Sequence, residues 1–361
     1  MKRVSSSLLL ISALALTGVS CQSSQSGEEG QSNELLPSAK GRPGEIVLIM
    51  DSTLWRGLVG EQIRSVFQKY QVGLPQNEPL FTLSRVDPGK FNHVLEQVHN
   101  LVFVTTFDVN TPSSNRLKSF FTAQSMERIK ADSSLFMYTK EDQFARGQQV
   151  LYLFGLSQQQ LANHISKNAG SIRALFNDAE RERWISRHQQ KSEKKLTAHL
   201  RQKMNLSLTI PFGFELADEK EDFIWLRRME GEVDKSIFVT QMPYTSERQF
   251  DLDSLIAIRN RVGKQYIWGS DSLSYLETEL NYDTCYTREV NFSGAYAVEV
   301  RGLWKLHNNA MGGPFVAYAV VNEATNTFTY AESFVYAPGG TKREELREME
   351  AALWTLSFPK P

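Results

Sequence analysis

The chain has 361 residues, of which 41% are hydrophobic and 11% aromatic. At roughly 150 residues per domain, this length suggests about two folded domains. The composition excludes an intrinsically disordered chain, because disorder goes with few aromatic residues and a large net charge. Lysine and arginine total 40 against 41 for aspartate and glutamate. Since nucleic-acid-binding proteins carry a basic excess or stripe, this balance argues against a nucleic-acid partner.

The first 21 residues have the pattern of a bacterial lipoprotein signal peptide. Lys2 and Arg3 precede an apolar run over residues 8–16, which is shorter than the ~20 residues of a membrane span. Gly18-Val19-Ser20-Cys21 follows and resembles a lipobox, although Leu is commoner where Gly18 stands. We predict that residues 1–20 are removed and that Cys21 carries acyl chains such as palmitate. The alternative is an ordinary secretory signal with an incidental cysteine.

A lipid on Cys21 makes the membrane the first predicted partner. Each buried CH₂ contributes about 0.8 kcal/mol, so two or more acyl chains anchor a protein stably. Residues 21–44 are rich in Ser, Gly, Gln and Glu, which predicts a flexible tether. Cys285 then has no partner cysteine in the mature chain. We interpret it as a small, buried apolar residue and not as a reactive thiol.

Residues 45–203 predict an N-terminal α/β domain. Glu45–Met50 is a continuous apolar run, which is typical of a buried strand. Helical spacing of apolar residues follows over 55–70 and again over 91–98. Strands are expected over 80–86, 101–107, 134–139 and 148–155, with a helix over 115–130. The β-α-β-α-β order at the start favours a sheet covered by helices.

The polar segment 157–203 completes this domain and predicts a helical hairpin that breaks at Gly170. Its many charges are typical of a solvated helix face. The alternative is a projecting arm that contacts an envelope protein partner.

Residues 204–361 predict an antiparallel-rich C-terminal α+β domain. The expected elements are a strand over 206–210, a hairpin over 214–230, strands over 236–244 and 285–305, a hairpin over 315–336, and helices that begin near Asp251 and Thr341. Thr341 and Glu344 have the spacing of a capping box. The order of elements looks like a PsbP-type α/β sandwich, and fold alone does not determine function.

The sequence shows few of the motifs that are typical of enzymes. G-x-S-x-G, P-loop, G-x-G-x-x-G and H-E-x-x-H motifs do not occur. His93 and His99 would face different sides of a helix, and His188 and His199 would lie about 16 Å apart along one. We therefore expect no metal site and no cofactor.

The stretch RGLWKLHNNAMGGP, residues 301–314, is the best candidate for a ligand-binding loop. It gathers Arg301, Trp304, His307, Asn308 and Asn309. Asn and His supply hydrogen bonds, Trp supplies a stacking surface, and glycine lets a backbone approach closely. The alternative is a wide connection between strands whose Gly and Asn serve the backbone.

Three stretches, GEIVLIMD, GLPQNEPLFTLSRV and RGLWKLHNNAMGGPFVAY, together with the tether, resemble a family of uncharacterised lipoproteins of Bacteroidota known only as a domain of unknown function. The resemblance covers residues 35–358. It implies an outer-membrane lipoprotein and carries over no catalytic residue. Gln22 is not an acidic retention signal, and Glu28 and Glu29 come late for surface display, so we expect the periplasmic face.

Two functions follow as hypotheses. The first is a lipid-anchored, non-enzymatic binding or scaffolding protein of the cell envelope. The alternative is an envelope hydrolase with its site near loop 301–314 or at the domain junction. Shifted pKa values in a cleft would favour the hydrolase.

Overall fold

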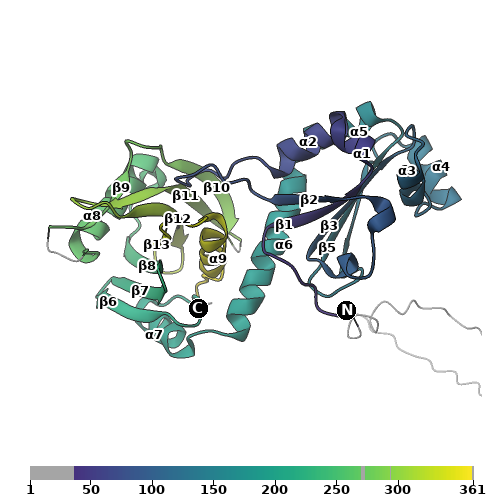
Figure 1. Ribbon diagram of the computed structural model, residues 1–361. Helices are drawn as coiled ribbons and strands as arrows, with labels where there is room; N and C mark the ends of the chain where they lie inside the picture. Colours follow the sequence, from purple (N-terminus) through teal and green to yellow (C-terminus); the bar gives the residue numbers. More distant parts are fainter. Residues whose placement is uncertain (1–35, 270–272, 293, 360–361) are drawn as a thin grey trace, which may run out of the picture. The chain divides into compact units, whose positions relative to one another are not determined.

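The computed structural model describes residues 36–269, 273–292 and 294–359 (Figure 1). Cys21, the signal peptide and the tether up to residue 35 lie outside these ranges. Across the described part of the chain, no helix is both long enough and apolar enough to cross a membrane. The end of the predicted tether is held in place, because Ala39 N–H donates to Arg146 O at 2.8 Å and Lys40 N–H donates to Gln97 O at 2.7 Å.

The first sheet has the strand order β2-β1-β3-β5-β4. Its strands are β1 (Glu45–Met50), β2 (Thr82–Val86), β3 (Asn100–Thr106), β4 (Met137–Glu141) and β5 (Gln149–Gly155). All pairs are parallel except β4 with β5, so β4 is an antiparallel edge strand. The apolar runs of β1 and β3 are buried almost throughout, as expected of strands covered on both faces.

Four helices cover one face of this sheet: α1 (Ser52–Arg56), α2 (Leu58–Phe67), α5 (Gln158–Lys167) and α6 (Ala169–Gln190). The helix predicted over 55–70 is confirmed over Leu58–Phe67, but it does not run unbroken from its cap, because the chain is extended at Gly57, with φ −96° and ψ −168°. The resulting bend brings α2 against α1. A Cβ on Gly60 would lie 1.9 Å from the Trp55 carbonyl oxygen, so a side chain here would force the two helices apart.

The opposite face is more thinly covered, by α3 (Pro112–Lys118), α4 (Ala123–Ala131) and two short 3₁₀ turns, η2 (Pro88–Lys90) and η3 (Leu95–Gln97). The helix predicted over 91–98 is wrong. The Asn92 side chain accepts hydrogen bonds from the N–H groups of Val94 and Leu95, and such local bonds compete with a helix. The apolar residues Phe91, Leu95 and Val98 still pack on the sheet.

The polar segment 157–203 differs from the predicted solvated hairpin, because it forms three helices and part of it is buried. It forms α5, α6 and α7 (Lys194–Met204), and the first break falls at Asn168. Gly170 lies inside α6, so the predicted break there is wrong. Glu180 and His188 of α6 are buried, and His188 Nε2 lies 3.1 Å from the Glu348 carbonyl oxygen. This helix is therefore packed against the body and is not a projecting arm.

The second sheet is antiparallel, with the order β10-β11-β12-β13-β8-β7-β6, and β9 pairs with β11. Its strands are β6 (Glu215–Lys220), β7 (Phe223–Glu230), β8 (Val233–Pro243), β9 (Leu276–Glu279), β10 (Tyr286–Phe292), β11 (Ala295–Leu306), β12 (Gly312–Asn322) and β13 (Thr327–Tyr336). The predicted hairpins are confirmed by the β6–β7 and β12–β13 pairs.

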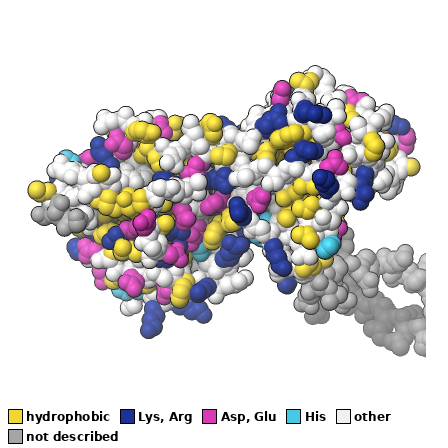
Figure 2. All heavy atoms as spheres, viewed as in Figure 1, with side chains coloured by type: hydrophobic (Ala, Val, Ile, Leu, Met, Phe, Trp, Pro, Cys, Tyr) yellow, Lys and Arg dark blue, Asp and Glu magenta, His cyan; other side chains and the backbone are white. Residues whose placement is uncertain are grey.

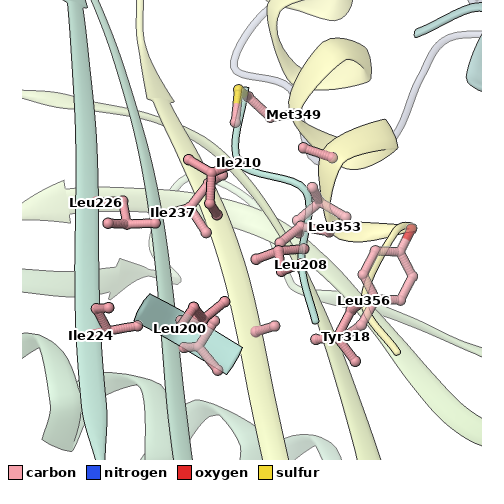
Figure 3. Packing of buried hydrophobic residues seen from close by; sticks show 14 of the residues in the cluster. Leu200, Leu208, Ile210, Ile224, Leu226, Ile237, Tyr318, Met349, Leu353 and Leu356 are labelled. Carbon is pink, nitrogen blue, oxygen red and sulfur yellow. The ribbon is translucent and has the colours of Figure 1, made fainter. Parts of the chain in front are cut away.

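Helices pack on both faces of the second sheet. On one face, α7 and α9 (Arg343–Leu353) cover a core that includes Leu200, Leu226, Ile237 and Leu353 (Figure 3). On the other face, η4 (Glu247–Phe250) and α8 (Leu252–Tyr266) cover a second core. The strand predicted over 206–210 is wrong, although its apolar side chains are fully buried. It makes only a single bridge, Ser207 with Ser357.

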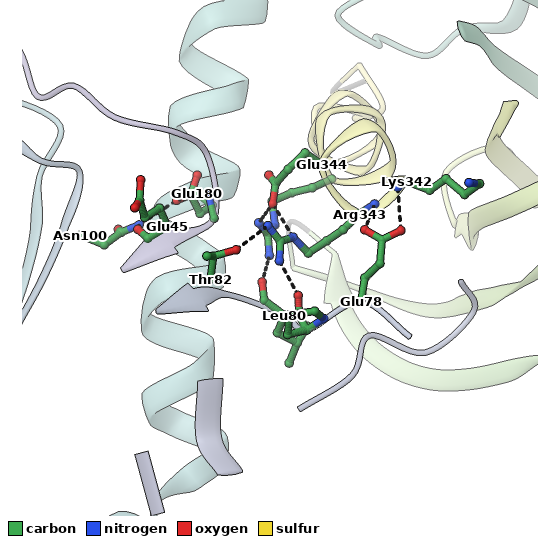
Figure 4. Close-up of polar contacts among 12 residues, drawn as sticks. Glu45, Glu78, Leu80, Thr82, Asn100, Glu180, Lys342, Arg343 and Glu344 are labelled. Carbon is green, nitrogen blue, oxygen red and sulfur yellow. Dashed lines mark hydrogen bonds and ion pairs between the residues drawn. The ribbon is translucent and has the colours of Figure 1, made fainter. Parts of the chain in front are cut away.

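The N-terminus of α9 is capped from a distant part of the chain (Figure 4). The predicted capping box of Thr341 and Glu344 is wrong, because no side chain of the helix's own N-cap makes that bond. Instead, the Glu78 carboxylate accepts the N–H groups of Lys342 at 2.7 Å and Arg343 at 3.0 Å. Arg347 of α9 also donates to the Leu80 carbonyl at 2.8 Å. The predicted fold class, α/β followed by antiparallel α+β, is confirmed.

Candidate functional site

The predicted loop 301–314 is a β-hairpin, because β11 continues to Leu306 and β12 begins at Gly312. Only residues 307–311 form the connection. The structure does not bring the five predicted residues together. Arg301 lies on the sheet face of Tyr318, whereas Trp304 lies on the opposite face, in the core with α8.

Arg301 is occupied by carboxylates of the protein. Its Nε lies 2.8 Å from Glu299 Oε1, and its Nη2 lies 2.6 Å from Glu350 Oε1. Burial opposes ionisation of Glu299, but the guanidinium groups of Arg301 and Arg288 outweigh it and lower the pKa of Glu299 to about 2. Arg301 therefore has a structural role in a buried ion network.

The other predicted residues serve the hairpin. The Trp304 indole is 3% exposed and donates to the Val335 carbonyl at 3.1 Å. The His307 ring stacks on Tyr275, with centroids 4.7 Å apart. Asn308 adopts φ 55°, and Asn309 Oδ1 accepts the Met311 N–H at 3.0 Å, as turn residues do. A ligand-binding role for these residues stays a prediction.

Cys285 is a free, buried cysteine. Burial raises the pKa of its thiol to about 11, so the thiolate is scarce at neutral pH. This agrees with an unreactive, apolar role.

A different place has the geometry of a binding site. An open cavity of about 860 Å³ lies on the thinly covered face of the first sheet, bordered by β4, β5, α4 and the end of α3. Pockets for drug-sized ligands span roughly 300–1,000 Å³. Seven aromatic side chains line it: Phe91, Phe120, Phe121, Tyr138, Phe144, Tyr152 and Phe154.

The strands position these rings by simple alternation. Tyr152 and Phe154 are two residues apart on β5, so they point to the same face. Tyr138 of the edge strand is in register with Tyr152, with ring centroids 6.1 Å apart. Phe121 packs edge-on against Phe154 at 5.3 Å. The result is an apolar wall at one edge of the sheet.

The hydroxyl of Tyr152 is a polar group within this aromatic wall. The Tyr152 oxygen accepts a hydrogen bond from Gln143 Nε2 at 2.7 Å. Burial raises the pKa of Tyr152, so the phenol stays protonated. Within the described ranges its O–H has no acceptor, and the Gln143 Oε1 atom is buried without a partner. Tyr152 and Gln143 thus form a hydrogen-bonded polar pair in the cavity lining.

Three cations surround the same cavity. Arg116, Arg128 and Lys140 line it, and none of them has an anionic partner in the part of the chain that is described. Glu96 is the single acid in the lining. The cavity therefore combines an aromatic interior with an excess of positive charge, which fits a ligand with an apolar body and an anionic head.

Sequence reasoning missed this site because its residues are spread over 91–154 and each resembles a core residue. The adjacent pair Phe120-Phe121 just after a short helix was the one local signal. Phe120 is 51% exposed.

Elsewhere on the visible surface, positive and negative side chains are interspersed (Figure 2), in keeping with the net charge of −1. No group of His, Cys, Asp or Glu suited to a metal ion occurs among the described residues.

The described chain thus contains two sheets, each covered by helices, and a ligand-sized cavity lies on the first. Residues 39–189 match the model of a domain of unknown function, DUF8532, and residues 192–355 match another, DUF4837. The chain thus carries two domains of unknown function and fits an uncharacterised family. None of the curated proteins matches it.

Two solved structures are similar to part of the chain. A mutant form of protein Mog1 is 11% identical with a TM-score of 0.27, and the match covers 41% of this chain and 84% of the Mog1 chain. The Saccharomyces cerevisiae Ran-binding protein Mog1p is 12% identical with a TM-score of 0.25, and the match covers 41% of this chain and 79% of that chain. Likenesses this weak say nothing about function.

Proposed function

We propose that this protein is a lipid-anchored, non-enzymatic binding module of the cell envelope. The observation that carries the binding function is the aromatic cavity of the first sheet, with its unpaired cations and the Tyr152 hydroxyl in its lining. We propose that Cys21 carries the lipid and that the body faces the periplasm at the outer membrane. This part is supported by the signal-peptide pattern of residues 1–21.

The chemistry of the cavity favours an amphipathic acid, such as a fatty acid or an aryl carboxylic acid. Burying apolar ligand surface contributes about 25 cal/mol per Å², and the seven rings provide the surface for it. Arg116 and Arg128 offer guanidinium groups that match a carboxylate. A hydrogen bond from Tyr152 to a charged oxygen contributes about 1.5–3 kcal/mol. A neutral ligand would leave these polar groups unused.

A displacement assay with an environment-sensitive fluorescent fatty acid tests this proposal on the mature chain carrying Cys21→Ala. Dodecanoic acid should displace the probe at least about tenfold better than dodecanol, because only the acid pairs with the cations. Tyr152→Phe should weaken acid binding about tenfold or more, since it removes one charge-assisted hydrogen bond, and should leave dodecanol binding unchanged.

A matched control comes from cations outside the cavity. Arg116→Gln with Lys140→Gln should weaken acid binding, whereas Lys195→Gln with Arg201→Gln, which removes the same charge from exposed positions on α7, should not. Equal binding of acid and alcohol, or equal effects of the cavity and control changes, would refute the proposed ligand class.

At loop 301–314, one of the two places predicted for it, the hydrolase alternative gains no support. The His307 ring contacts Tyr275 and Glu277. The nearby Ser274 hydroxyl donates to the His307 backbone carbonyl at 3.1 Å and not to the ring, so the ring does not activate it as a nucleophile.

A further inference from the structure

A second cavity, of about 780 Å³, lies in the C-terminal half and shares no residue with the aromatic cavity of the first sheet. It opens over the sheet face that α8 covers, at the end where β10 forms the edge. Residues of β10, β11, η4 and the segment just before η4 line it.

Three aromatic rings form one side of this cavity. Phe250 meets Tyr296 edge-on, with ring centroids 5.2 Å apart and an interplanar angle of 85°. Tyr244 lies 6.2 Å from Phe250 at 57°. Tyr296 is 53% exposed, so its ring face is open to a ligand. Rings set at steep angles around one space present several negative π-faces to a cation.

Local bonds hold these rings in place. The capping box of Ser246 and Gln249 fixes η4, which ends at Phe250. Asn326, in the left-handed conformation with φ 51°, donates its side-chain N–H to the Tyr244 carbonyl at 3.1 Å and accepts the Tyr244 N–H on its own carbonyl at 3.0 Å. The ring positions are therefore preorganised.

Four carboxylates border the same space: Glu247, Asp251, Glu289 and Glu323. Over the described ranges, none of them has a cationic partner. Arg288 is the one basic residue of the lining, and its guanidinium is bound to Glu299 at 2.8 Å on the opposite face of the sheet. Because the Arg288 guanidinium lies on the other face, the four carboxylates leave the cavity with an excess of negative charge, which a single ammonium ion would not neutralise.

The neighbouring strand edge is unpaired. β10 ends the sheet, and its residues Thr287, Arg288 and Glu289 reach the cavity. An edge strand presents a row of free N–H and C=O groups, to which an extended peptide can add as a further strand. A peptide in that position would place alternate side chains over the aromatic rings.

We propose that this cavity binds a lysine side chain of an extended, basic peptide segment of a partner protein, which adds to the edge of β10. The aromatic rings contact the ammonium group, and the carboxylates neutralise it and the charges of the flanking lysines. Because a peptide carries several cations at alternate positions, it matches both the excess charge and the strand edge. This interaction is independent of the amphipathic-acid site.

The test uses the full chain in an uncharged detergent and a synthetic peptide of alternating lysine and threonine. We expect calorimetric binding at low salt that weakens as salt rises. The same peptide with acetyl-lysine keeps its shape but loses its charge, and should bind at least about tenfold more weakly. N-methylation of alternate backbone amides should also weaken binding, because it removes the donors that would pair with β10.

Variants separate the cavity from general charge. Two variants change the cavity: the pair Glu289→Gln and Glu323→Gln, and separately Tyr296→Leu. Each should weaken binding of the lysine peptide several-fold to about tenfold. Glu221→Gln with Glu232→Gln removes the same charge from exposed positions elsewhere and should have no effect. All three proteins should unfold at nearly the same temperature as the parent, since the changed side chains are exposed.

Three results would overturn the inference. One is equal binding of the lysine and acetyl-lysine peptides. A second is equal weakening of peptide binding by the cavity pair and the control pair of Glu→Gln substitutions, which would show that the overall charge of the protein, and not this cavity, attracts the peptide. The third is binding of tetramethylammonium that matches the peptide, which would assign the cavity to small quaternary amines instead.

Discussion

At the scale of single residues, the most consequential group outside either cavity is the ion pair of Arg259 and Glu332. Both side chains are almost fully buried, at 1% and 0% exposure. Two Arg259 nitrogens, Nε and Nη2, each lie 2.9 Å from a Glu332 oxygen. The guanidinium also lies 4.1 Å above the centre of the Phe315 ring. This pair sits in the core under α8 and holds that helix to β13.

Removing one partner of this pair should be far worse than removing both. Glu332→Leu leaves a buried guanidinium uncompensated and should reduce the free energy of unfolding by about 3–5 kcal/mol. Arg259→Met together with Glu332→Leu should cost clearly less than the single change, because no charge remains buried. Urea unfolding of the three proteins measures this. A double variant at least as unstable as the single variant would contradict the argument.

At the scale of elements, α9 shows how a helix end is completed by a remote residue. Glu78 comes from the connection between α2 and β2, yet its carboxylate accepts the first N–H groups of α9. A carboxylate at this end also interacts favourably with the helix dipole. The sequence around Thr341 resembles a self-sufficient cap, but the structure uses Glu78.

Two substitutions distinguish the caps. Glu78→Ala should lower the free energy of unfolding by about 1–2 kcal/mol, the range for loss of an N-cap. Thr341→Ala should change it by less than about 0.5 kcal/mol, as for an exposed surface position. Denaturant unfolding measures both losses. A larger loss for Thr341→Ala than for Glu78→Ala would show that the local capping box, and not Glu78, caps α9.

At the scale of the whole molecule, the proposed anchor and the folded body have separate roles. The sheets, cores and cavities lie within residues 36–359, whereas Cys21 lies outside the described residues. In the function proposed above, the anchor would determine where the protein works, and the folded body would determine what it binds.

Substitution of the two cysteines tests the anchor. Cys21→Ala should move the protein from the membrane fraction to the soluble fraction of lysed cells, because the acyl chains are then missing. Cys285→Ala should leave the protein in the membrane fraction, since that thiol is buried in the fold. Retention of the Cys21→Ala protein on membranes would show that something other than a lipid on Cys21 holds it.

Much of the secondary structure follows from local pattern. The spacing of apolar side chains predicts which face of a strand or helix is buried. This holds for the apolar run of β1, the alternation in β12 and β13, and the apolar stripe of α9. Local pattern failed where a competing local bond intervened. Asn92 turned a predicted helix into a 3₁₀ turn, and Asn168, not Gly170, separates α5 from α6.

The sequence by itself determined the class of fold, the positions of most strands, and the lipoprotein pattern around Cys21, because these are short-range properties. Only the tertiary structure decided which of the candidate side chains remain free. It bound Arg301 into an ion network and Trp304 into a core, and it gathered rings and unpaired cations from residues 91–154 into one cavity. The physical reason is that a site depends on which charges and rings find partners, and partners distant in sequence meet only when the chain folds.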